Sequence, residues 1–243
     1  MHTITMRLSG EFALLLELKQ PNEQTLDATM PAQIRQLAAW CGELCGDAVQ
    51  EIVPSYHTLL LSFTPYHPRW PAIIDELENA CKQWQTEFGQ PLCLPGQLLQ
   101  LPVWYNSNVA PDLASVAHQH GLSTQQVAAL HSAIDYPVYA VGFTPGFAYL
   151  GFVDQQLATP RHATPRVSVP AGSVAIADRQ TAVYPTATPG GWNIIGQCPI
   201  PLSPDWCQVG DRVRFVAVDE ARFYELRQHP SQWQLEVTND PAA

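Results

Sequence analysis

Proline and glycine interrupt this chain at short intervals from residue 136 to residue 204, which limits what that stretch can fold into. Ten of the 22 prolines lie there. Short β-like runs remain between them, at 138–141, 167–169, 174–176, 182–184 and 194–195. Because proline lacks a backbone donor and breaks helices, long helices are not expected here. Many short strands at close spacing favour a barrel or sandwich over a doubly wound sheet.

The first ninety residues follow a different pattern, in which strands and helices alternate. Apolar runs predict strands at 12–18, 52–53 and 58–63, and the helical period predicts helices at 30–45 and from Pro71 onward. The order β-α-β-β-α indicates a small sheet with helices on one face. Turn signals at 88–91 and 95–96 place a domain boundary after this part.

The remaining segments complete the expected organisation. Strands are predicted at 98–105 and 212–218, and helices at 112–118 and 123–132. A last helix is predicted to begin after Asp219, its N-cap, and to end at residue 227. We therefore expect an N-terminal domain over residues 1–92, a second domain over 96–230, and a C-terminal tail over 231–243.

Composition excludes several classes of protein. With 22 acidic and 12 basic residues the net charge is −10, and the two lysines form no basic face, so a nucleic-acid partner is not expected. No apolar run is long enough to span a bilayer, and the start has no signal-peptide pattern. The six cysteines contain no CxxC motif, and since no signal peptide is visible, reduced thiols in the cytoplasm are expected. Cys41 and Cys45 are interpreted as small apolar helix residues, with a metal half-site as the alternative.

Common catalytic and nucleotide motifs are absent from the sequence. No two glycines form GxG, neither lysine follows a glycine-rich loop, and neither GxSxG nor HExxH occurs. A dinucleotide fingerprint, a P-loop, a nucleophile elbow and a zincin helix are therefore excluded, and no residue is assigned as a metal ligand.

The candidate site starts in a loop rich in glycine and aromatic residues. Residues 142–151 place three aromatic side chains among three glycines and a proline, and the site residues predicted here are Phe143, Pro145, Gly146 and Phe147. Glycine is expected where the backbone turns with positive φ or approaches a ligand closely. The alternative is a tight aromatic corner with a purely structural role.

Two arginines and a second rigid turn extend the candidate site. Residues 136–200 contain three arginines and two aspartates, a net charge of +1 in an acidic chain, and Arg161 and Arg166 lie in its proline-rich part. Guanidinium groups suit carboxylates and phosphates, so an anion site is predicted, with ordinary surface ion pairs to Asp154 or Asp178 as the alternative. The further predicted binding residues are Gln180, Tyr184, Gly190, Gly191 and Trp192.

His131 is the expected titrating group. It ends the predicted helix 123–132, and carboxylates are scarce in the segment that follows. A helix C-terminus favours a protonated imidazole. We expect His131 to face the loop at 143–147 and to act with Arg166 in catalysis, the alternative being a histidine that caps the helix end.

Four strings carry a resemblance to a known family. They are GFTPGFAYLGF (142–152), LATPRHATPRVSVPAGSVAIA (157–177), QTAVYP (180–185) and TPGGWNIIGQCP (188–199). Together they resemble the KipI/allophanate hydrolase subunit 1 family, whose bacterial members include the B subunit of the ATP-dependent 5-oxoprolinase. The resemblance covers roughly residues 7–218.

The resemblance implies an α+β fold, with a small ferredoxin-like α/β domain followed by a cyclophilin-like β-barrel. It implies an enzyme component that is inactive alone and works with a C-type subunit (KipA/allophanate hydrolase subunit 2) and an A-type subunit (LamB/YcsF). The implied reaction converts 5-oxo-L-proline, ATP and water to L-glutamate, ADP and phosphate, with Mg²⁺ at a shared interface site and no bound organic cofactor. Inhibition of a sensor histidine kinase and allophanate or urea chemistry are the alternatives.

The chain departs from the family pattern at two places. In the family, glycines and a carboxylate commonly precede the sequence Pro-Asp-Leu, which is 111–113 here, but residues 106–110 lack them. Asp178 and Arg179 stand where a glycine pair is often found before Gln180. These positions bear on which of the family's activities applies.

Overall fold

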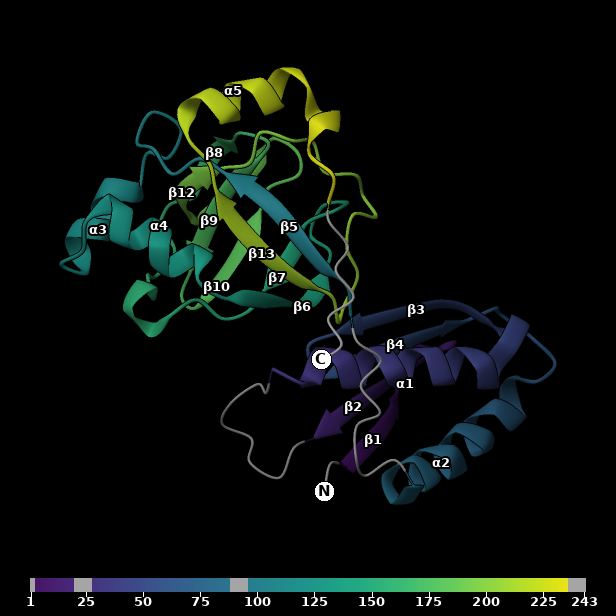
Figure 1. Cartoon of the computed structure of the whole chain (residues 1–243). Helices are drawn as coiled ribbons and strands as arrows, with labels where there is room; N and C mark the ends of the chain where they lie inside the picture. Colours follow the sequence, from purple (N-terminus) through teal and green to yellow (C-terminus); the bar gives the residue numbers. More distant parts are fainter. Residues whose placement is uncertain (1–2, 20–27, 88–95, 236–243) are drawn as a thin grey trace. The chain divides into compact units, whose positions relative to one another are not determined.

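The computed structural model describes residues 3–19, 28–87 and 96–235 (Figure 1). The chain divides into two compact units, residues 1–95 and 96–242. Among the described residues, none of the helices combines the length and the apolar character needed to cross a membrane.

The N-terminal unit has the element order ββαββα. Its elements are β1 (Thr3–Leu8), β2 (Ala13–Lys19), α1 (Met30–Cys45), a 3₁₀ turn (Gly46–Ala48), β3 (Val49–Ser55), β4 (Thr58–Phe63) and α2 (Trp70–Glu87). The four strands pair antiparallel in the order β1-β2-β4-β3. The predicted strands and helices are confirmed. The sequence did not indicate β1, because Ile4 is its only buried residue.

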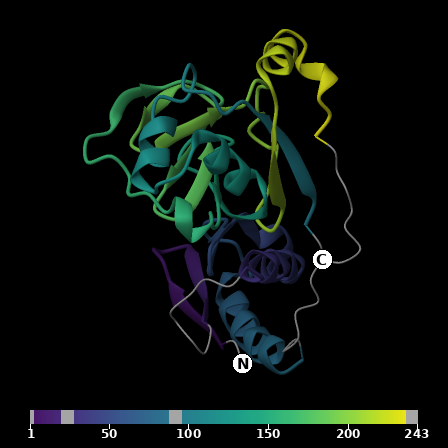
Figure 2. The same cartoon turned by 60° about the vertical axis from the view of Figure 1, so that its left-hand side comes forward.

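One face of this sheet is apolar and lies under both helices (Figures 1 and 2). Alternate residues of β2 and β4 are buried, namely Leu14, Leu16, Leu18, Leu59, Leu61 and Phe63. Cys41 and Cys45 of α1 are fully buried, and burial raises the pKa of Cys45 to about 11, so both behave as small apolar side chains. The described elements form a small α/β unit, but their order differs from the β-α-β-β-α-β order of a ferredoxin-like domain.

The C-terminal unit is built on a mostly antiparallel sheet. Its strands are β5 (Leu98–Val103), β6 (Asp135–Val141), β7 (Ala148–Leu150), β9 (Ser173–Ala177), β10 (Gln180–Val183), β12 (Asn193–Gln197) and β13 (Arg212–Ala217). They lie in the order β5-β13-β6-β7-β10-β9-β12, with only β5 and β13 parallel. A separate pair is formed by β8 (Arg166–Val169) and β11 (Thr188–Gly190).

The described strands of this unit do not form a closed barrel, which corrects the predicted β-barrel. The end strands β5 and β12 share no ladder, because β5 ends at Val103 and only the next residue reaches β12. There Trp104 and Gln197 form one isolated bridge, with N···O distances of 2.9 and 3.0 Å. The fold is thus a mixed α/β arrangement with a strongly curved, nearly continuous sheet.

Three helices accompany this sheet: α3 (Leu113–Gln119), α4 (Thr124–Ser132) and α5 (Glu220–Gln228), with 3₁₀ turns at Gln155–Leu157 and Pro230–Gln232. Figure 1 shows α3 and α4 together on the outside of the sheet. The predicted caps are confirmed. The Ser123 hydroxyl accepts from the Gln126 amide in a capping box, and the Asp219 carboxylate accepts from the Arg222 amide.

Candidate functional site

A cavity of about 480 Å³ opens in the C-terminal unit and brings together most of the predicted site residues. Its walls come from the loop after β6, the segment before β8, and the turn that joins β11 to β12. The lining residues are Phe143, Phe147, Tyr149, Arg161, Pro165, Tyr184, Thr188, Pro189, Gly190, Gly191 and Trp192. Seven of these eleven residues were predicted from the sequence.

Aromatic rings form the wall of the cavity around Phe147. The Phe147 ring centroid lies 5.4 Å from Phe143, 5.0 Å from Tyr149, 5.3 Å from Tyr184 and 5.8 Å from Trp192, and each pair is edge-to-face. This arrangement is favourable for aromatic pairs and fixes the rings against one another. Phe147 is buried in the core of the unit, so the wall is anchored from behind.

The loop that carries Phe143 is held in a strained conformation. Phe143 has φ of +79° and is 63% exposed, although a bulky residue is rarely found in the left-handed region. Gly146 has φ of +81°, and a Cβ there would lie 2.9 Å from the Ser203 carbonyl oxygen. The Trp206 indole N–H donates to the Gly146 carbonyl at 2.7 Å. Core contacts therefore hold Phe143 at the rim of the cavity.

Tyr184 and the glycine turn fit closely against each other. A Cβ on Gly190 would lie 2.4 Å from the Tyr184 hydroxyl, whereas a Cβ on Gly191 would meet nothing closer than 3.5 Å. Only Gly190 is therefore required for steric reasons. Burial raises the pKa of the Tyr184 phenol, which stays protonated at neutral pH and can donate a hydrogen bond.

Of the described residues that line the cavity, Arg161 alone is charged. It is exposed and forms no ion pair with the described residues. Its neighbours on both sides are fixed: the Pro160 carbonyl accepts from the Asn193 side-chain amide at 2.9 Å, and the His162 N–H donates to the Gly191 carbonyl at 2.7 Å. The guanidinium is thus carried by a backbone segment that is held in place.

Arg166, predicted as catalytic, does not line the cavity. Its Nη2 donates to Asp112 Oδ1 at 2.6 Å, and Asp112 Oδ2 accepts from the Ile194 amide at 2.7 Å. His162 Nε2 lies 3.3 Å from the same Asp112 Oδ1. Asp112 is buried, and these contacts connect the start of α3 to two of the three wall segments, the one before β8 and the turn that leads into β12. The expected alternative, pairing with Asp154 or Asp178, is not what the structure has.

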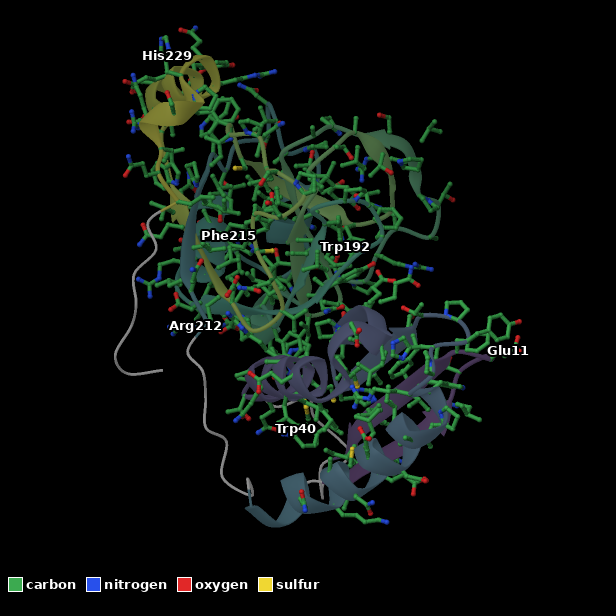
Figure 3. The ribbon with its side chains drawn as sticks, turned by 90° about the vertical axis from the view of Figure 1, so that its right-hand side faces the viewer. Glu11, Trp40, Trp192, Arg212, Phe215 and His229 are labelled. Carbon is green, nitrogen blue, oxygen red and sulfur yellow. The ribbon has the colours of Figure 1, made fainter. Side chains whose placement is uncertain are left out.

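His131 does not face the 143–147 loop but lies in the core. Its ring is fully buried and stacks on Phe215 at 4.5 Å. Trp192, beside the cavity, and Phe215 are labelled well apart in Figure 3. Burial lowers the pKa of His131 to about 3, because charge is costly in an apolar core. The helix-end argument for a protonated imidazole therefore fails.

The hydrogen bonds of His131 define its tautomer. The Thr181 hydroxyl donates to the Ala175 carbonyl at 3.1 Å, so it accepts from His131 Nε2–H at 2.8 Å. Nδ1 is then the acceptor for the Tyr105 hydroxyl at 2.7 Å. Both ring nitrogens are thus hydrogen-bonded within the core of the unit.

Three other predicted residues lie outside the cavity lining. Pro145 is exposed at the tip of the loop, Gly146 is buried next to it, and Gln180 begins β10. Sequence reasoning missed Tyr149, Pro165, Thr188 and Pro189, although all four lie within the strings that carried the family resemblance. It also missed Asp112, which belongs to the PDL sequence at 111–113.

Asp178 and Arg179, where the chain departs from the family pattern, form the hairpin turn between β9 and β10 and do not line the cavity. Asp178 has φ of +51°, a region that aspartate tolerates better than most residues. Its backbone pairs with Thr159 at 2.7 and 3.1 Å. Asp178 thus occupies a turn position with positive φ that does not line the cavity.

The described residues of the cavity lining offer no carboxylate to hold Mg²⁺. No group of three or more His, Cys, Asp or Glu side chains among them is placed to hold a metal ion. The eleven described residues that line the cavity include no carboxylate. Mg²⁺ with a nucleotide normally needs at least one carboxylate ligand, so the residues of this cavity do not fit the metal.

Comparison with known proteins gives close relatives along most of the chain. Residues 4–206 match the family described as carboxyltransferase domain, subdomain C and D. The chain is 39% identical over 221 residues to the B subunit of 5-oxoprolinase from Escherichia coli O157:H7, covering 88% of this chain and 95% of that one. It is 41% identical over 231 residues to the B subunit of 5-oxoprolinase from Bacillus subtilis (strain 168), covering 90% and 95%. The predicted resemblance is confirmed.

Solved structures show the same fold within longer chains. A crystal structure of TTHA0988 matches with a TM-score of 0.70 and 31% identity, covering 88% of this chain. This chain spans 40% of the length of that one. The urea carboxylase of Kluyveromyces lactis matches with a TM-score of 0.70 at 15% identity, over 97% of this chain and 23% of that one, which is a likeness of fold alone.

Proposed function

Since this chain belongs to the family of the carboxyltransferase domain, subdomains C and D, and its curated relatives are 5-oxoprolinase B subunits, we propose that it is the B subunit of an ATP-dependent 5-oxoprolinase. The assembled enzyme would convert 5-oxo-L-proline, ATP and water to L-glutamate, ADP and phosphate. The observation that carries the proposal is identity of 35–41% to three such proteins, over 87–95% of their lengths.

The cavity supports this function because it suits a small ring compound with polar edges. Flat aromatic walls can flank a five-membered lactam ring, and Arg161 supplies a positive charge. The Tyr184 hydroxyl, kept protonated by burial, can donate to a carbonyl. We assign substrate or nucleotide binding in the complex to this cavity, with Phe143, Phe147, Arg161, Tyr184 and the 190–192 turn as its binding residues.

Arg166 acts in this proposal as a positioning residue. It holds the buried Asp112 carboxylate, which in turn binds the Ile194 amide just beyond the cavity turn. His131 is assigned to the core and not to proton transfer. Neither side chain reaches the cavity, so each acts on the reaction only through the walls it supports.

The chain is proposed to work only in a complex. Among the described residues the cavity lining has no carboxylate for a metal, and the sequence has no P-loop motif, so ATP and Mg²⁺ need groups from elsewhere. A C-type subunit and an A-type subunit would supply them. The match to part of the longer TTHA0988 chain is consistent with a unit that functions beside other domains. For the fold, we propose a partly open cyclophilin-like arrangement of the C-terminal unit.

Copurification followed by an activity assay tests the proposal. We expect the chain to form a stable complex with the C-type subunit of the same organism in sizing chromatography at micromolar concentration. Addition of the A-type subunit should give ADP release that depends on 5-oxo-L-proline. A monomer that ignores the partner, or ADP release with allophanate or urea but not with 5-oxo-L-proline, would refute it.

A further inference from the structure

We propose that the cavity around Phe147 takes the monoanionic lactam acid and not the nucleotide, with Arg161 as the residue that selects the carboxylate. This inference rests on the proposed function and divides the two co-substrates of the reaction between different places. A cavity of about 480 Å³ would admit either molecule, so the chemistry of its walls must decide.

The first argument is the count of charges. Arg161 is the only charged side chain in the lining, and it has no ion-pair partner among the described residues. One guanidinium matches one carboxylate in a planar, bidentate pair. A nucleoside triphosphate carries several negative charges, and a single exposed arginine would leave most of them unmatched.

The second argument is the absence of metal-binding groups in the lining. A triphosphate in an enzyme normally carries Mg²⁺, which is held by protein carboxylates or hydroxyls together with phosphate oxygens. The cavity offers the Thr188 hydroxyl and no carboxylate. The lactam acid needs no metal to bind.

The third argument is that Arg161 is positioned before any ligand arrives. The residues on either side of it are hydrogen-bonded to Asn193 and to Gly191, so its backbone cannot follow a shifted ligand. Gly191 belongs to the same turn as Trp192, and both line the cavity. The point from which the Arg161 side chain extends and the aromatic wall therefore keep a fixed relation, which favours a small ligand of defined shape.

The fourth argument concerns the remaining polar contact. The lactam has one ring carbonyl besides its carboxylate. The protonated Tyr184 hydroxyl is a donor at the wall of the same cavity. One donor for the carbonyl, one cation for the carboxylate and aromatic faces for the ring account for each functional group of 5-oxo-L-proline except the lactam N–H.

Calorimetric titration of the assembled complex with three probes tests the assignment. The probes are 5-oxo-L-proline, 2-pyrrolidinone, which is the same ring without the carboxylate, and Mg·ATP. We expect Arg161→Ala to raise the Kd for 5-oxo-L-proline at least tenfold, and Arg161→Lys to restore part of the loss. The Kd values for 2-pyrrolidinone and Mg·ATP should change less than twofold.

Arg179→Ala is the matched control, because it removes the same charge from an exposed position that does not line the cavity. It should leave all three Kd values unchanged. If Arg161→Ala weakens Mg·ATP instead of the lactam acid, or weakens neither, the assignment is wrong while the proposed function stands. If the wild-type complex neither binds 5-oxo-L-proline nor releases ADP with it, the proposed function itself fails and the assignment fails with it.

Discussion

Gly190 and Gly191 stand next to each other in the wall of the cavity, and the structure predicts opposite effects for the same added methyl group. A Cβ at position 190 would lie 2.4 Å from the Tyr184 hydroxyl and 2.8 Å from its Cζ. The Tyr184 ring cannot swing away easily, since it is buried and packs edge-on against Phe147 at 5.3 Å. A Cβ at position 191 would meet its nearest neighbour, the His162 carbonyl, at an ordinary 3.5 Å.

The magnitudes follow from these distances. Overpacking a tightly filled site costs about 1–3 kcal/mol, and a contact of 2.4 Å belongs near the upper end of that range. Replacing glycine by alanine where no strain arises stabilises by about 0.4–1 kcal/mol through the unfolded state. Neither glycine has a positive φ, so alanine at either position should bring the stabilisation that comes from restricting the unfolded chain. Gly190→Ala should therefore lose about 2 kcal/mol, and Gly191→Ala should gain a few tenths to about 1 kcal/mol.

Thermal unfolding of the full chain, followed by circular dichroism, measures the difference. Gly190→Ala should lower the Tm by about 4–8 °C and Gly191→Ala should raise it by about 1–4 °C. In the complex, Gly190→Ala should also weaken 5-oxo-L-proline binding at least tenfold, because Tyr184 is displaced. Equal Tm values for the two variants would contradict the close fit of Gly190 against Tyr184, and so would unchanged substrate binding by Gly190→Ala.

Three further predictions concern the residues behind the cavity and at its rim. Asp112→Asn leaves the Arg166 guanidinium without its charged partner and should lower the free energy of unfolding, measured in urea, by about 2–3 kcal/mol. The loss should be smaller than for a fully buried ion pair because the Arg166 side chain is 30% exposed. An unchanged urea midpoint would contradict the network around Asp112. Burial lowers the pKa of His131 to about 3 in the folded chain, whereas the same histidine in the unfolded chain binds a proton below pH ~6.5. The free energy of unfolding should therefore fall as the pH is lowered from ~6 to ~4, by up to about 1.4 kcal/mol per pH unit. His131→Gln should remove that slope in urea titrations, and a slope that persists would assign it to other groups. Phe143→Asn and Phe143→Ala both lose the ring contact with Phe147 and should weaken substrate binding, but only asparagine tolerates φ of +79°, so the Asn variant should be more stable than the Ala variant by about 1 kcal/mol. Equal Tm values for these two variants would show that the residue is not strained.

Much of the fold could be predicted because local signals and tertiary packing agree. The helix at 30–45 follows a strict apolar period, and the structure has it as Met30–Cys45. Ser123 and Asp219 cap their helices through side-chain oxygens, as their positions indicated. Strand β1 gave no such signal, because its side chains are mostly exposed and its pairing with β2 is a backbone contact that no local pattern marks.

The candidate site was predictable in part, for a similar reason. Glycine and aromatic residues mark a turn beside a ligand surface, so Phe147, Gly190 and Trp192 could be identified from composition alone. The roles of Arg161 and Arg166 could not be separated, because the distinction depends on Asp112, which lies 54 residues before Arg166 in the chain. Proximity to a helix end suggested a charged His131, but the surrounding core overrides that effect by desolvation.

Conversion of labelled 5-oxo-L-proline tests most directly the claim that this chain is a required subunit of a 5-oxoprolinase. Uniformly ¹³C-labelled 5-oxo-L-proline is incubated with ATP, the C-type and A-type subunits, and either this chain or buffer in its place, and the products are followed by NMR. We expect labelled glutamate to appear in one-to-one ratio with ADP, and only when this chain is present. Labelled lactam that stays unchanged in a complex containing all three proteins, or glutamate that forms equally without this chain, would contradict the account.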